Sequence, residues 1–579
     1  MAAARSLASL GALFALVACG GGGGGSAVPP PPPAAPSDAV LSVSLSGGAS
    51  TGIDHLWVTV TGIAIHADAT RVYGDGDPGW VVQMLDTPIT VDLADPSLSQ
   101  GGGVSLFKQN ISTLGTFAQL RLLVAPSDPA LQLASSASKL GLQFNDEVQY
   151  TDGTGAHVVP LEVPDSQAGL RLLTSFGLTS DTTTPLAIEW NANSLVRRAS
   201  VGGPDRFALR NELQGYNQQL LTLLGDGNLQ IGGSVFDSIS GQLDTTNFCT
   251  GASHAGCIHD VVASATSVSS DKLFHAEVRS VDVSSTGAFL LYPLPSDPMY
   301  DVVIRGGNMR TIIVHNVIVD PTGLVRAFPT LLGSPDTPIV PVLDTSERAV
   351  TLASALAPAS SRVFFGQTVA GSGNGSGGPD IPYAIVTGNA DPASGRLLQA
   401  LTLPGGPLQF ATFDTSKDGN GASPTFATVT PTEGLGAWTT WSQGTLATST
   451  SATTTLAAGA STATVANPAP RAGFSTGTLT VTLSGTTSNG ADHAELIVSN
   501  DGGTVAVADV SAQIASHGGT TAISVPSGSS ASAPAAAVYG VALRTWVAAS
   551  ETGTTRWVRA GAPTSLSTAT TASVDLVLP

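Results

Sequence analysis

The segment CTGASHAGCIH at residues 249–259 brings four metal-binding side chains into one short loop. Cys249, His254, Cys257 and His259 have the composition of a two-cysteine, two-histidine zinc site. Structural zinc sites take their ligands from two separated pairs, so four ligands within one loop would be strained. A disulfide between the two cysteines needs no such geometry and stabilises by about 2.5 kcal/mol in the chain-entropy model. The segment therefore predicts either a disulfide or a metal site.

GASTG at residues 48–52 matches the Gly-x-Ser-x-Gly pattern of a hydrolase nucleophile elbow. That elbow requires a strand, a sharp turn and then a helix that supports the oxyanion hole. The residues after Ser50 read IDHLWVTVTG, which is rich in β-branched residues and unsuited to a helix start. We therefore assign no catalytic residue to this motif.

Two acidic turns, YGDGDPG (73–79) and DTSKDGNG (414–421), suggest calcium loops. A calcium loop of the EF-hand type ends in a bidentate carboxylate, and neither turn has one at that spacing. Acidic hairpin turns explain both segments without a metal ion.

The dipeptides Asp54-His55 and Asp492-His493 suggest a repeated acid–base pair. A histidine at a strand edge is a poor general base unless another group orients it. We therefore expect no catalytic group here, and the sequence indicates no cofactor.

The N-terminus has the parts of a secretory signal, with Arg5 followed by the apolar run Leu7–Ala18. The run is too short to span a bilayer, which takes about twenty residues. Its end, Leu16-Val17-Ala18-Cys19, resembles the bacterial lipobox. That resemblance implies cleavage of residues 1–18 as a lipoprotein signal peptide and diacylation of Cys19, so the membrane is a partner through the N-terminal lipid. An ordinary signal peptide with an incidental cysteine is the alternative.

Residues 19–39 form the lipidated cysteine and a tether, with flexible glycines at 20–25 and a stiff polyproline spacer at 29–33. By analogy with lipoprotein sorting, a glycine after the lipidated cysteine points to the outer membrane of a bacterial envelope. If Cys19 carries the lipid, Cys249 and Cys257 remain as an even pair in an oxidising compartment. This favours the disulfide over the metal site.

The 579-residue chain carries 42 acidic and 23 basic residues, for a formal charge of −19. Such a chain repels polyanions, so nucleic acid is excluded as a partner. Charged residues make up 11% and aromatic residues 5% of the chain, and there are 66 glycines. Segments rich in Thr and Val with glycine-rich loops between them favour strands. We expect a mainly β, multidomain chain of antiparallel β-sandwich modules, with one short helix over 207–224.

Four segments within residues 40–213 carry a family resemblance, and they read, in order, LSVSLSGGASTGIDHLWVTVTGIAIH, TLGTFAQLRLLV, VPDSQAGLRLLTSFGL and LAIEWNANSLV. Together they resemble a bacterial lipoprotein family known as domain of unknown function 4382. The chain departs from the family's common pattern at residues 46–49 and 189–191. The resemblance implies a secreted, anchored β-domain without an established activity.

Three further regions complete the chain. Residues 228–340 contain GNLQIGGSVFD and STGAFLLYPLP, which resemble β-sandwiches of the transthyretin or carboxypeptidase-regulatory type. Residues 341–470 read as a β-rich module followed by a low-complexity linker. LTVTLSGTTSNGADH (479–493) aligns without a gap with LSVSLSGGASTGIDH (41–55), and nine of these fifteen residues are identical. We therefore predict that residues 472–579 are a shortened repeat of the first β-domain.

These features predict a lipid-anchored envelope or cell-surface protein with a non-catalytic binding or structural role and a protein or glycan ligand. The alternative is a hydrolase of envelope or extracellular polymers, whose site the sequence does not locate. A pocket lined by converging carboxylates or histidines would favour the enzyme. Exposed tryptophans among Trp57, Trp438 and Trp441 would favour binding, although core packing also explains them.

Overall fold

The computed structural model describes residues 38–579 except for the gaps 48–51, 75, 96–97, 99–103, 129–130, 164–165, 167, 191–195, 199–205, 210–219, 223–236, 251–253, 269–273, 295–298, 320–329, 357–361, 372–378, 392–393, 398–400, 415–422, 444–449, 470–471, 489, 502, 531–532 and 551–554. The predicted signal peptide, Cys19 and nearly all of the predicted tether therefore lie outside the described residues, as do Ser50 and most of the acidic turn at 414–421.

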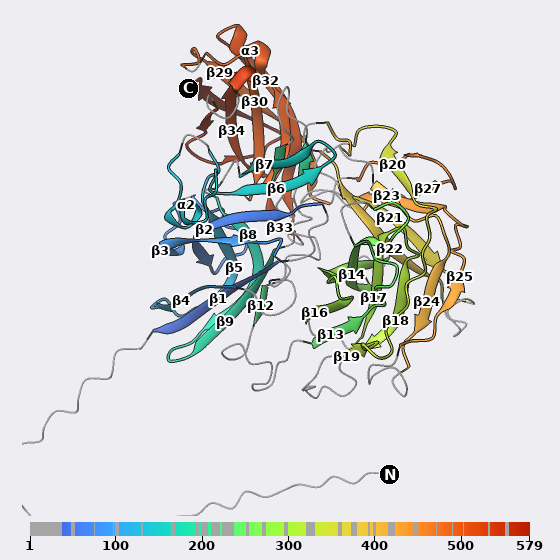
Figure 1. Ribbon diagram of the computed structural model, residues 1–579. Coiled ribbons are helices and arrows are strands. Elements are labelled where there is room, and N and C mark those ends of the chain that lie inside the picture. The colour runs from blue at the N-terminus through green and yellow to red at the C-terminus, as the bar shows by residue number, and fades with distance from the viewer. Residues whose placement is uncertain are drawn as a thin grey trace, which may run out of the picture. The chain divides into compact units, whose positions relative to one another are not determined.

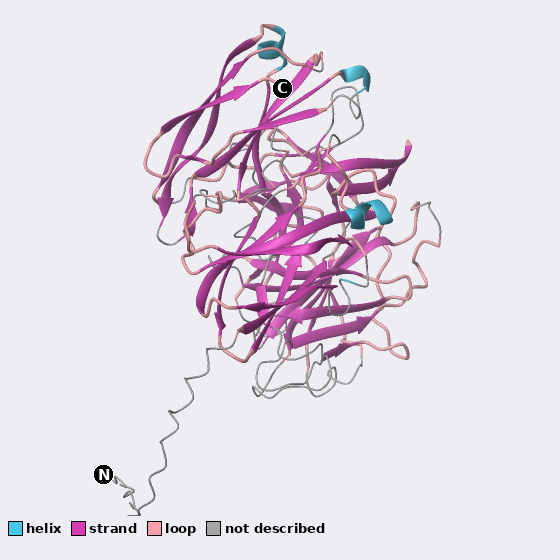
Figure 2. Cartoon of the chain, turned by 90° about the vertical axis from the view of Figure 1, so that its left-hand side faces the viewer, coloured by secondary structure: helices cyan, strands magenta, loops and turns pink. Residues whose placement is uncertain are grey.

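The predicted fold class is confirmed, since strand accounts for 59% and helix for 3% of the structure (Figure 2). The described helices are the single turns α2 (Ser135–Lys139), α3 (Ser511–Ala515) and the 3-10 turn η2 (Ala548–Ser550). None of the described helices is long and apolar enough to cross a membrane.

The helix expected over 207–224 is wrong at both described ends of that range. Strands β11 (Arg206–Ala208) and β12 (Leu220–Thr222) stand there, and residues 210–219 are outside the described part. Phe207 pairs in parallel with Leu161, and both residues are buried in the core of the first domain. Burial of this segment against a sheet overrides its helical pattern.

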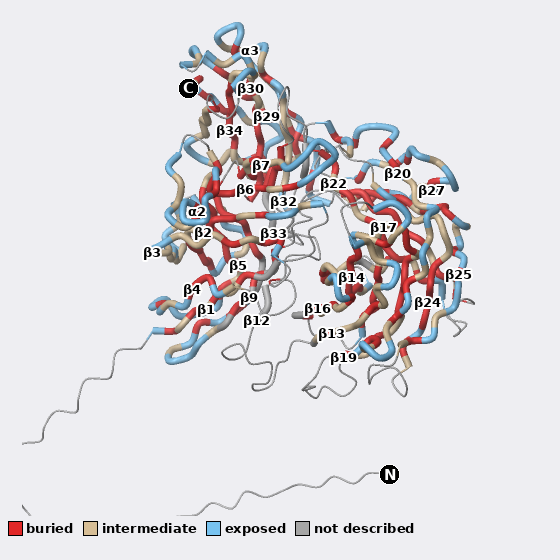
Figure 3. Tube along the Cα trace, in the orientation of Figure 1, coloured by how far each residue is buried: buried red, intermediate tan, exposed pale blue. Residues whose placement is uncertain are grey.

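The first domain consists of two sheets whose inner faces form one core (Figure 3). The smaller sheet has the order β12-β9-β1-β4, with β1 (Ala39–Gly47), β4 (Val104–Ile111) and β9 (Thr183–Trp190). The larger sheet has the order β10-β11-β7-β6-β2-β5-β8, and β3 pairs with β2; its strands are β2 (His55–His66), β3 (Val81–Asp92), β5 (Gly115–Val124), β6 (Glu147–Asp152), β7 (Gly155–Glu162), β8 (Leu170–Leu178) and β10 (Val196–Arg198). Leu41, Val43 and Leu45 of β1 all lie in the core, because alternate side chains of a strand share one face.

The C-terminal domain is a second two-sheet structure with its own core. One sheet has the order β33-β32-β29-β37, with β29 (Phe474–Ser484), β32 (Gly518–Ser530), β33 (Ala533–Ala536) and β37 (Thr571–Val577). The other has the order β31-β30-β34-β35, and β36 pairs with β34; its strands are β30 (His493–Asn500), β31 (Gly503–Asp509), β34 (Val538–Trp546), β35 (Arg556–Arg559) and β36 (Thr564–Ser565).

The two domains share a strand arrangement. In the first, β1 lies between an antiparallel β4 and a parallel β9; in the second, β29 lies between an antiparallel β32 and a parallel β37. The partner sheets also correspond, since the order β3-β2-β5-β8 matches β31-β30-β34-β35. The two aligned segments therefore occupy corresponding sheet positions, while duplication of one β-domain stays a prediction.

The register of the parallel pairs agrees as well. Val43 pairs with Leu186, and the aligned Val481 pairs with Val574. All four side chains are buried. Equivalent residues thus fill equivalent core positions, although the sequences of β9 and β37 show little identity.

Buried ion pairs join the first and the C-terminal domain. The Asp501 carboxylate lies 2.9 Å from Nη1 of Arg121 and 2.8 Å from Nη2 of Arg171, and all three side chains are buried. The arginines belong to the QLRLL and GLRLL segments of the first domain. Asp501 has a left-handed backbone, with φ of 49°, in the hairpin turn between β30 and β31. An Asp-Gly pair suits such a turn, which here carries the carboxylate to both guanidinium groups.

A second ionic contact reinforces the first. Arg206 donates to Glu162 of the first domain at 2.6 Å and to Glu495 of the C-terminal domain at 2.7 Å. The guanidinium of Arg544 lies 4.4 Å from the ring centroid of Trp546, and that of Arg206 lies 5.3 Å from it. Buried arginines are thus paired or stacked on both sides of the contact, as the cost of desolvating charge requires.

The middle body combines residues that the sequence separates into 228–340 and 341–470. Its largest sheet has ten strands in the order β25-β24-β18-β17-β14-β15-β22-β21-β26-β27 (Figure 1). These strands are β14 (His259–Val268), β15 (His275–Asp282), β17 (Met299–Gly307), β18 (Ile312–Ile318), β21 (Arg362–Val369), β22 (Ile381–Asn389), β24 (Leu408–Thr412), β25 (Ala427–Val429), β26 (Trp438–Gln443) and β27 (Thr454–Leu456). Strands from both ranges therefore belong to one sheet.

Two small sheets accompany the ten-stranded sheet. They have the orders β16-β13-β19 and β23-β20-β28, with β13 (Asp237–Gln242), β16 (Ala288–Leu294), β19 (Thr330–Leu332), β20 (Arg348–Leu352), β23 (Leu401–Leu403) and β28 (Thr462–Ala463). Strand β17 contributes Val302 to the core with the first small sheet and Val303 to the core with the second. The large sheet therefore supplies one wall of each core.

We predict that Asp501→Ala destabilises the protein strongly, because it leaves Arg121 and Arg171 buried without their shared carboxylate. Breaking one side of a buried ionic contact costs about 3–5 kcal/mol of unfolding free energy. Scanning calorimetry measures the effect as a lower melting temperature. Asp575→Ala, which removes an exposed carboxylate from β37 of the same domain, is the matched control. Equal melting temperatures for the two variants would contradict the importance of this ion pair.

Candidate functional site

A small pocket of about 70 Å³ lies against strands β21, β22 and β26 of the middle body. Three aromatic side chains, Phe274, Tyr383 and Trp441, line it. The lining also includes Thr368, Thr439, Thr450, Ser451 and Thr453, of which Thr368 and Thr439 donate their hydroxyls to Glu433. None of the described residues that line the pocket carries a formal charge. Aromatic walls with a few polar groups are typical of small-molecule sites.

Trp441 is one of the aromatic residues that line the pocket. Its ring stacks on Phe364 with centroids 5.5 Å apart and contacts Phe274 at 4.7 Å. A Cβ atom at Gly366 would lie 2.6 Å from the Trp441 ring, so only glycine leaves room for the indole against β21. The indole N–H of Trp441 is buried and has no hydrogen-bond partner in the described part of the chain. Trp441 is thus held in the wall of the pocket by its aromatic neighbours.

Tyr383 connects the pocket to a buried cluster of ionisable groups. Its hydroxyl donates to the Asp301 carboxylate at 2.8 Å. Nδ1 of His275 lies 3.0 Å from the same carboxylate, and Nδ1 of His315 lies 2.9 Å from it. We call Asp301, His275, His315 and Tyr383 the Asp301 cluster.

A break in strand pairing positions Asp301. The register between β17 and β18 shifts between Tyr300 and Val302, so Asp301 lies at an irregularity of the ladder. Asn316 opposite it has a left-handed backbone, with φ of 58°, and donates its N–H to Asp301 at 2.7 Å. Irregularities of this kind re-aim side chains and are frequent next to functional sites.

The surroundings of the Asp301 cluster lower the pKa of Asp301 and raise the pKa of Tyr383. Burial opposes ionisation of Asp301, but the hydrogen bonds from His275 and His315 outweigh it and hold the pKa of Asp301 well below its usual range. Burial and the charge of Asp301 raise the pKa of Tyr383 well above its ordinary value. Asp301 is therefore ionised and Tyr383 is a neutral donor at neutral pH.

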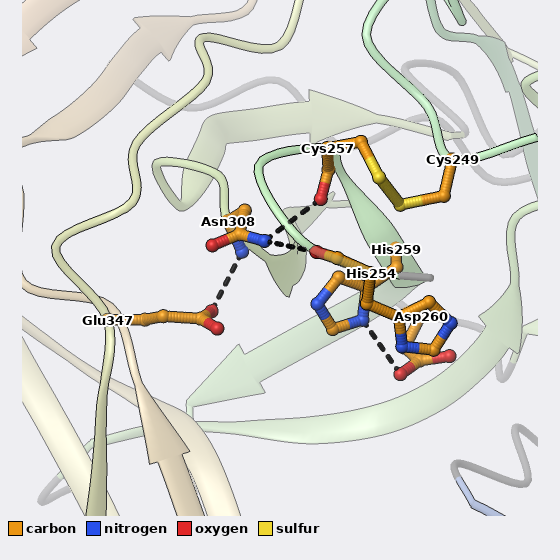
Figure 4. Close-up of a disulfide and its surroundings, with 7 residues drawn as sticks. All are labelled: Cys249, His254, Cys257, His259, Asp260, Asn308 and Glu347. Carbon is orange, nitrogen blue, oxygen red and sulfur yellow. Dashed lines mark hydrogen bonds and ion pairs between the residues drawn. A yellow bond between two sulfur atoms is a disulfide. The ribbon is translucent and has the colours of Figure 1, made fainter. Parts of the chain in front are cut away.

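Cys249 and Cys257 form a disulfide, with Cα atoms 5.1 Å apart (Figure 4). Both thiols are consumed, so neither cysteine is a thiolate ligand for a metal. His254 and His259 of the same segment stack with ring centroids 4.2 Å apart. A neighbour that the motif did not include, Asp260, places its carboxylate 3.0 Å from Nδ1 of His259.

The two Asp-His dipeptides form different contacts. Nδ1 of His55 lies 2.6 Å from Asp92, whereas Asp54 accepts a hydrogen bond from Thr151 at 2.7 Å. In the C-terminal domain, by contrast, His493 contacts its neighbour Asp492 at 2.8 Å. The aligned dipeptides thus do not form one repeated acid–base pair.

In the acidic turn at 73–79, other groups of the same chain bind the carboxylate of Asp77. Asp77 accepts the N–H of Gly79 at 2.7 Å and pairs with Arg71 at 2.9 Å. The hydrogen bond from Gly79 is the main cause that lowers the pKa of Asp77. The carboxylate of Asp77 thus binds the guanidinium of Arg71 and the backbone N–H of Gly79, as an acidic hairpin turn would.

The structure also describes the strand that follows the GASTG motif and the three tryptophans singled out in the sequence. Residues His55–His66 form strand β2, where a nucleophile elbow requires a helix. Trp438 and Trp441 are buried in hydrophobic clusters, and Trp57 is half-buried beside His55. Sequence reasoning missed the Asp301 cluster, because its four members are spread over residues 275–383 without a characteristic spacing.

Comparison with known proteins identifies the first domain. Residues 38–210 match the family model described as a domain of unknown function, DUF4382, which confirms the resemblance found in the sequence. No curated protein matches the chain. A solved structure titled "The Bacillus anthracis TIE protein" shares 9% identity over 94% of this chain and 73% of its own, with a TM-score of 0.14. A streptococcal ancillary pilin shares 11% identity over 75% of this chain and 100% of its own, with a TM-score of 0.13. At these TM-scores neither structure supports an argument about fold or function.

We predict that Asp301→Asn destabilises the middle body at neutral pH and that the deficit shrinks in acid. A carboxyl group whose folded pKa is depressed stabilises fully above its unfolded pKa of about 4 and loses that contribution as pH falls further. Urea unfolding of the wild type and the variant at pH 7 and pH 3 measures the difference. The control is Asp336→Asn, at an exposed position of the same body. A deficit that is equal at both pH values would contradict the assignment of an ionised Asp301.

Proposed function

We propose that this protein is a lipid-anchored component of the bacterial envelope whose middle body binds a sugar or short glycan without catalysing a reaction. The observation that carries this proposal is the lining of the pocket, which combines three aromatic residues with Thr and Ser residues and includes no charged side chain among its described residues. A neutral ligand with many hydroxyl groups matches that lining.

The chemistry of the pocket suits a sugar better than a purely apolar molecule. Sugar rings have apolar C–H faces that stack on aromatic side chains, and their hydroxyls exchange hydrogen bonds with Thr and Ser.

A hydrolase of envelope or extracellular polymers is the second candidate. The observation in its favour is that Tyr383 lines the pocket and also donates to Asp301, which two histidines contact. A single carboxylate with three hydrogen-bonding neighbours differs from the pair of carboxylates with which most glycosidases work. Binding without turnover is therefore our first proposal.

The lipid anchor rests on the sequence Leu16-Val17-Ala18-Cys19 and on the glycines and prolines that follow it. We propose that Cys19 carries the lipid and that the outer membrane is the location, since Gly20 follows the cysteine. Two or more acyl chains hold a protein stably at a membrane, where one chain is marginal. The DUF4382 domain at residues 38–210 then directly follows the tether.

We predict that Trp441→Leu weakens sugar binding several-fold, because it removes the aromatic ring on which a sugar face would stack, at a cost of about 1 kcal/mol. Thr453→Val removes one hydroxyl from the lining and is expected to weaken binding similarly. A glycan array identifies a ligand for the full secreted chain, and calorimetric titration compares the variants. Thr462→Val, at an exposed position outside the lining, is the control. Array-wide absence of binding, or equal affinities for all variants, would sink the proposal, and release of cleaved sugar would favour the hydrolase.

We predict that the native chain incorporates a fatty-acid analogue in bacteria and that Cys19→Ala abolishes the label. The thiol of Cys19 is the attachment point that the lipobox resemblance implies. Cys249→Ser/Cys257→Ser is the control that should keep the label. Absence of label on the native chain would remove the basis for the anchor and for the proposed location.

A further inference from the structure

We propose that His254, His259 and Asp260 form a binding site for a divalent transition-metal ion on the disulfide-closed loop of the middle body. One ligand atom from each of the three residues lies within 4.8 Å of the others. Zinc binds imidazole nitrogen and carboxylate oxygen at about 2.0–2.2 Å, so a small closure brings all three atoms onto one ion. The site does not depend on the sugar pocket, whose lining contains none of these residues.

The backbone places His259 and Asp260 on the same side of the chain. Neighbouring side chains of a regular strand point to opposite faces. Asp260 instead has a left-handed backbone with φ of 48°, and the pairing of β14 with β17 shifts between His259 and Val262. The Asp260 carboxylate consequently meets the His259 ring. Such strained conformations cost free energy and cluster at functional sites.

Contacts on both sides hold the loop in place, as Figure 4 shows. The amide of Asn308 donates to the carbonyl of His254 at 2.9 Å and to that of Cys257 at 3.0 Å. Glu347 in turn accepts the N–H of Asn308 at 2.7 Å. In addition to these hydrogen bonds, the Cys249–Cys257 disulfide closes the loop covalently. The backbone carrying His254 is therefore ordered before any ion arrives.

Packing also restrains the ring of His259. This ring lies against Gly307, where a Cβ atom would come within 2.2 Å of it. His254 is exposed, and its ring now stacks on that of His259. Binding requires the His254 ring to turn about χ2, which is a broad torsion for histidine. One ligand is therefore fixed, and the other adjusts at small cost.

The ligand set indicates the kind of ion. The disulfide leaves no thiolate, so the donors are two imidazoles and one carboxylate, a combination suited to zinc, copper or nickel. Three protein ligands leave at least one coordination position for water or an external donor. His254 and Asp260 are both exposed, so that position faces solvent.

Calorimetric titration of the untagged, oxidised full chain with Zn²⁺ tests the proposal. We expect a single site, and we expect His254→Ala or His259→Ala to weaken it by at least about tenfold. Asp260→Asn should weaken it as well, while asparagine still tolerates the left-handed backbone. His157→Ala is the matched control, because that histidine also pairs with an aspartate, Asp152, at 2.9 Å.

A count of free thiols in each variant checks that the Cys249–Cys257 disulfide persists, so that lost zinc binding reports a lost ligand and not an opened loop. Two results would overturn the site. One is a wild-type chain that does not bind Zn²⁺. The other is a His254→Ala/His259→Ala double variant that binds it with unchanged affinity.

Discussion

The carboxylate of Asp501 lies between the guanidinium groups of Arg121 and Arg171, and this contact joins domains that are separated by the whole middle body in sequence. Both arginines are at most 1% exposed. Charges buried so deeply are tolerated only when they are paired. Asp501 of the C-terminal domain supplies a carboxylate to both arginines where the two domains meet. Arg206, held between Glu162 and Glu495, imposes the same requirement at a second point.

The equivalence of the two domains explains how this contact arises. Both have a central strand flanked by one parallel and one antiparallel neighbour, so their cores follow the same plan. They differ in the turn after the second strand. In the first domain the chain runs from His66 to Val81 before β3 begins, whereas in the C-terminal domain a tight turn at Asp501 joins β30 to β31. The shortened turn presents the carboxylate that the first domain needs.

In the middle body, the buried carboxylate of Asp301 likewise joins segments that lie far apart in the sequence. Asp301 of β17 contacts His315 of β18 and Tyr383 of β22, and these strands come from both sides of the expected boundary at residue 340. His275 pairs in register with Tyr383 where β15 meets β22. The cluster thus links the two halves of the ten-stranded sheet beside the aromatic pocket. The disulfide loop with its histidines begins another strand, β14, so the pocket and the proposed metal site use separate elements.

The sequence by itself determined what depends on near neighbours in the chain. Alternating Thr and Val residues indicated strands, the LRLL segments indicated the DUF4382 domain, and the spacing of Cys249 and Cys257 favoured the disulfide. These features depend on side-chain period, turn chemistry and short loops, which a few residues specify.

Only the tertiary structure decided which distant groups meet. Phe207 and Ala208 read as helix but join a sheet, because their burial beside β7 outweighs local preference. Asp54 turns to Thr151 and leaves its neighbour His55 to Asp92. Asp301 and Asp501 look like ordinary loop or strand carboxylates in the sequence, and their importance comes from cations and donors that the fold brings to them from far along the chain. Pairing of buried charge is a property of the assembled core, so no local pattern announces it.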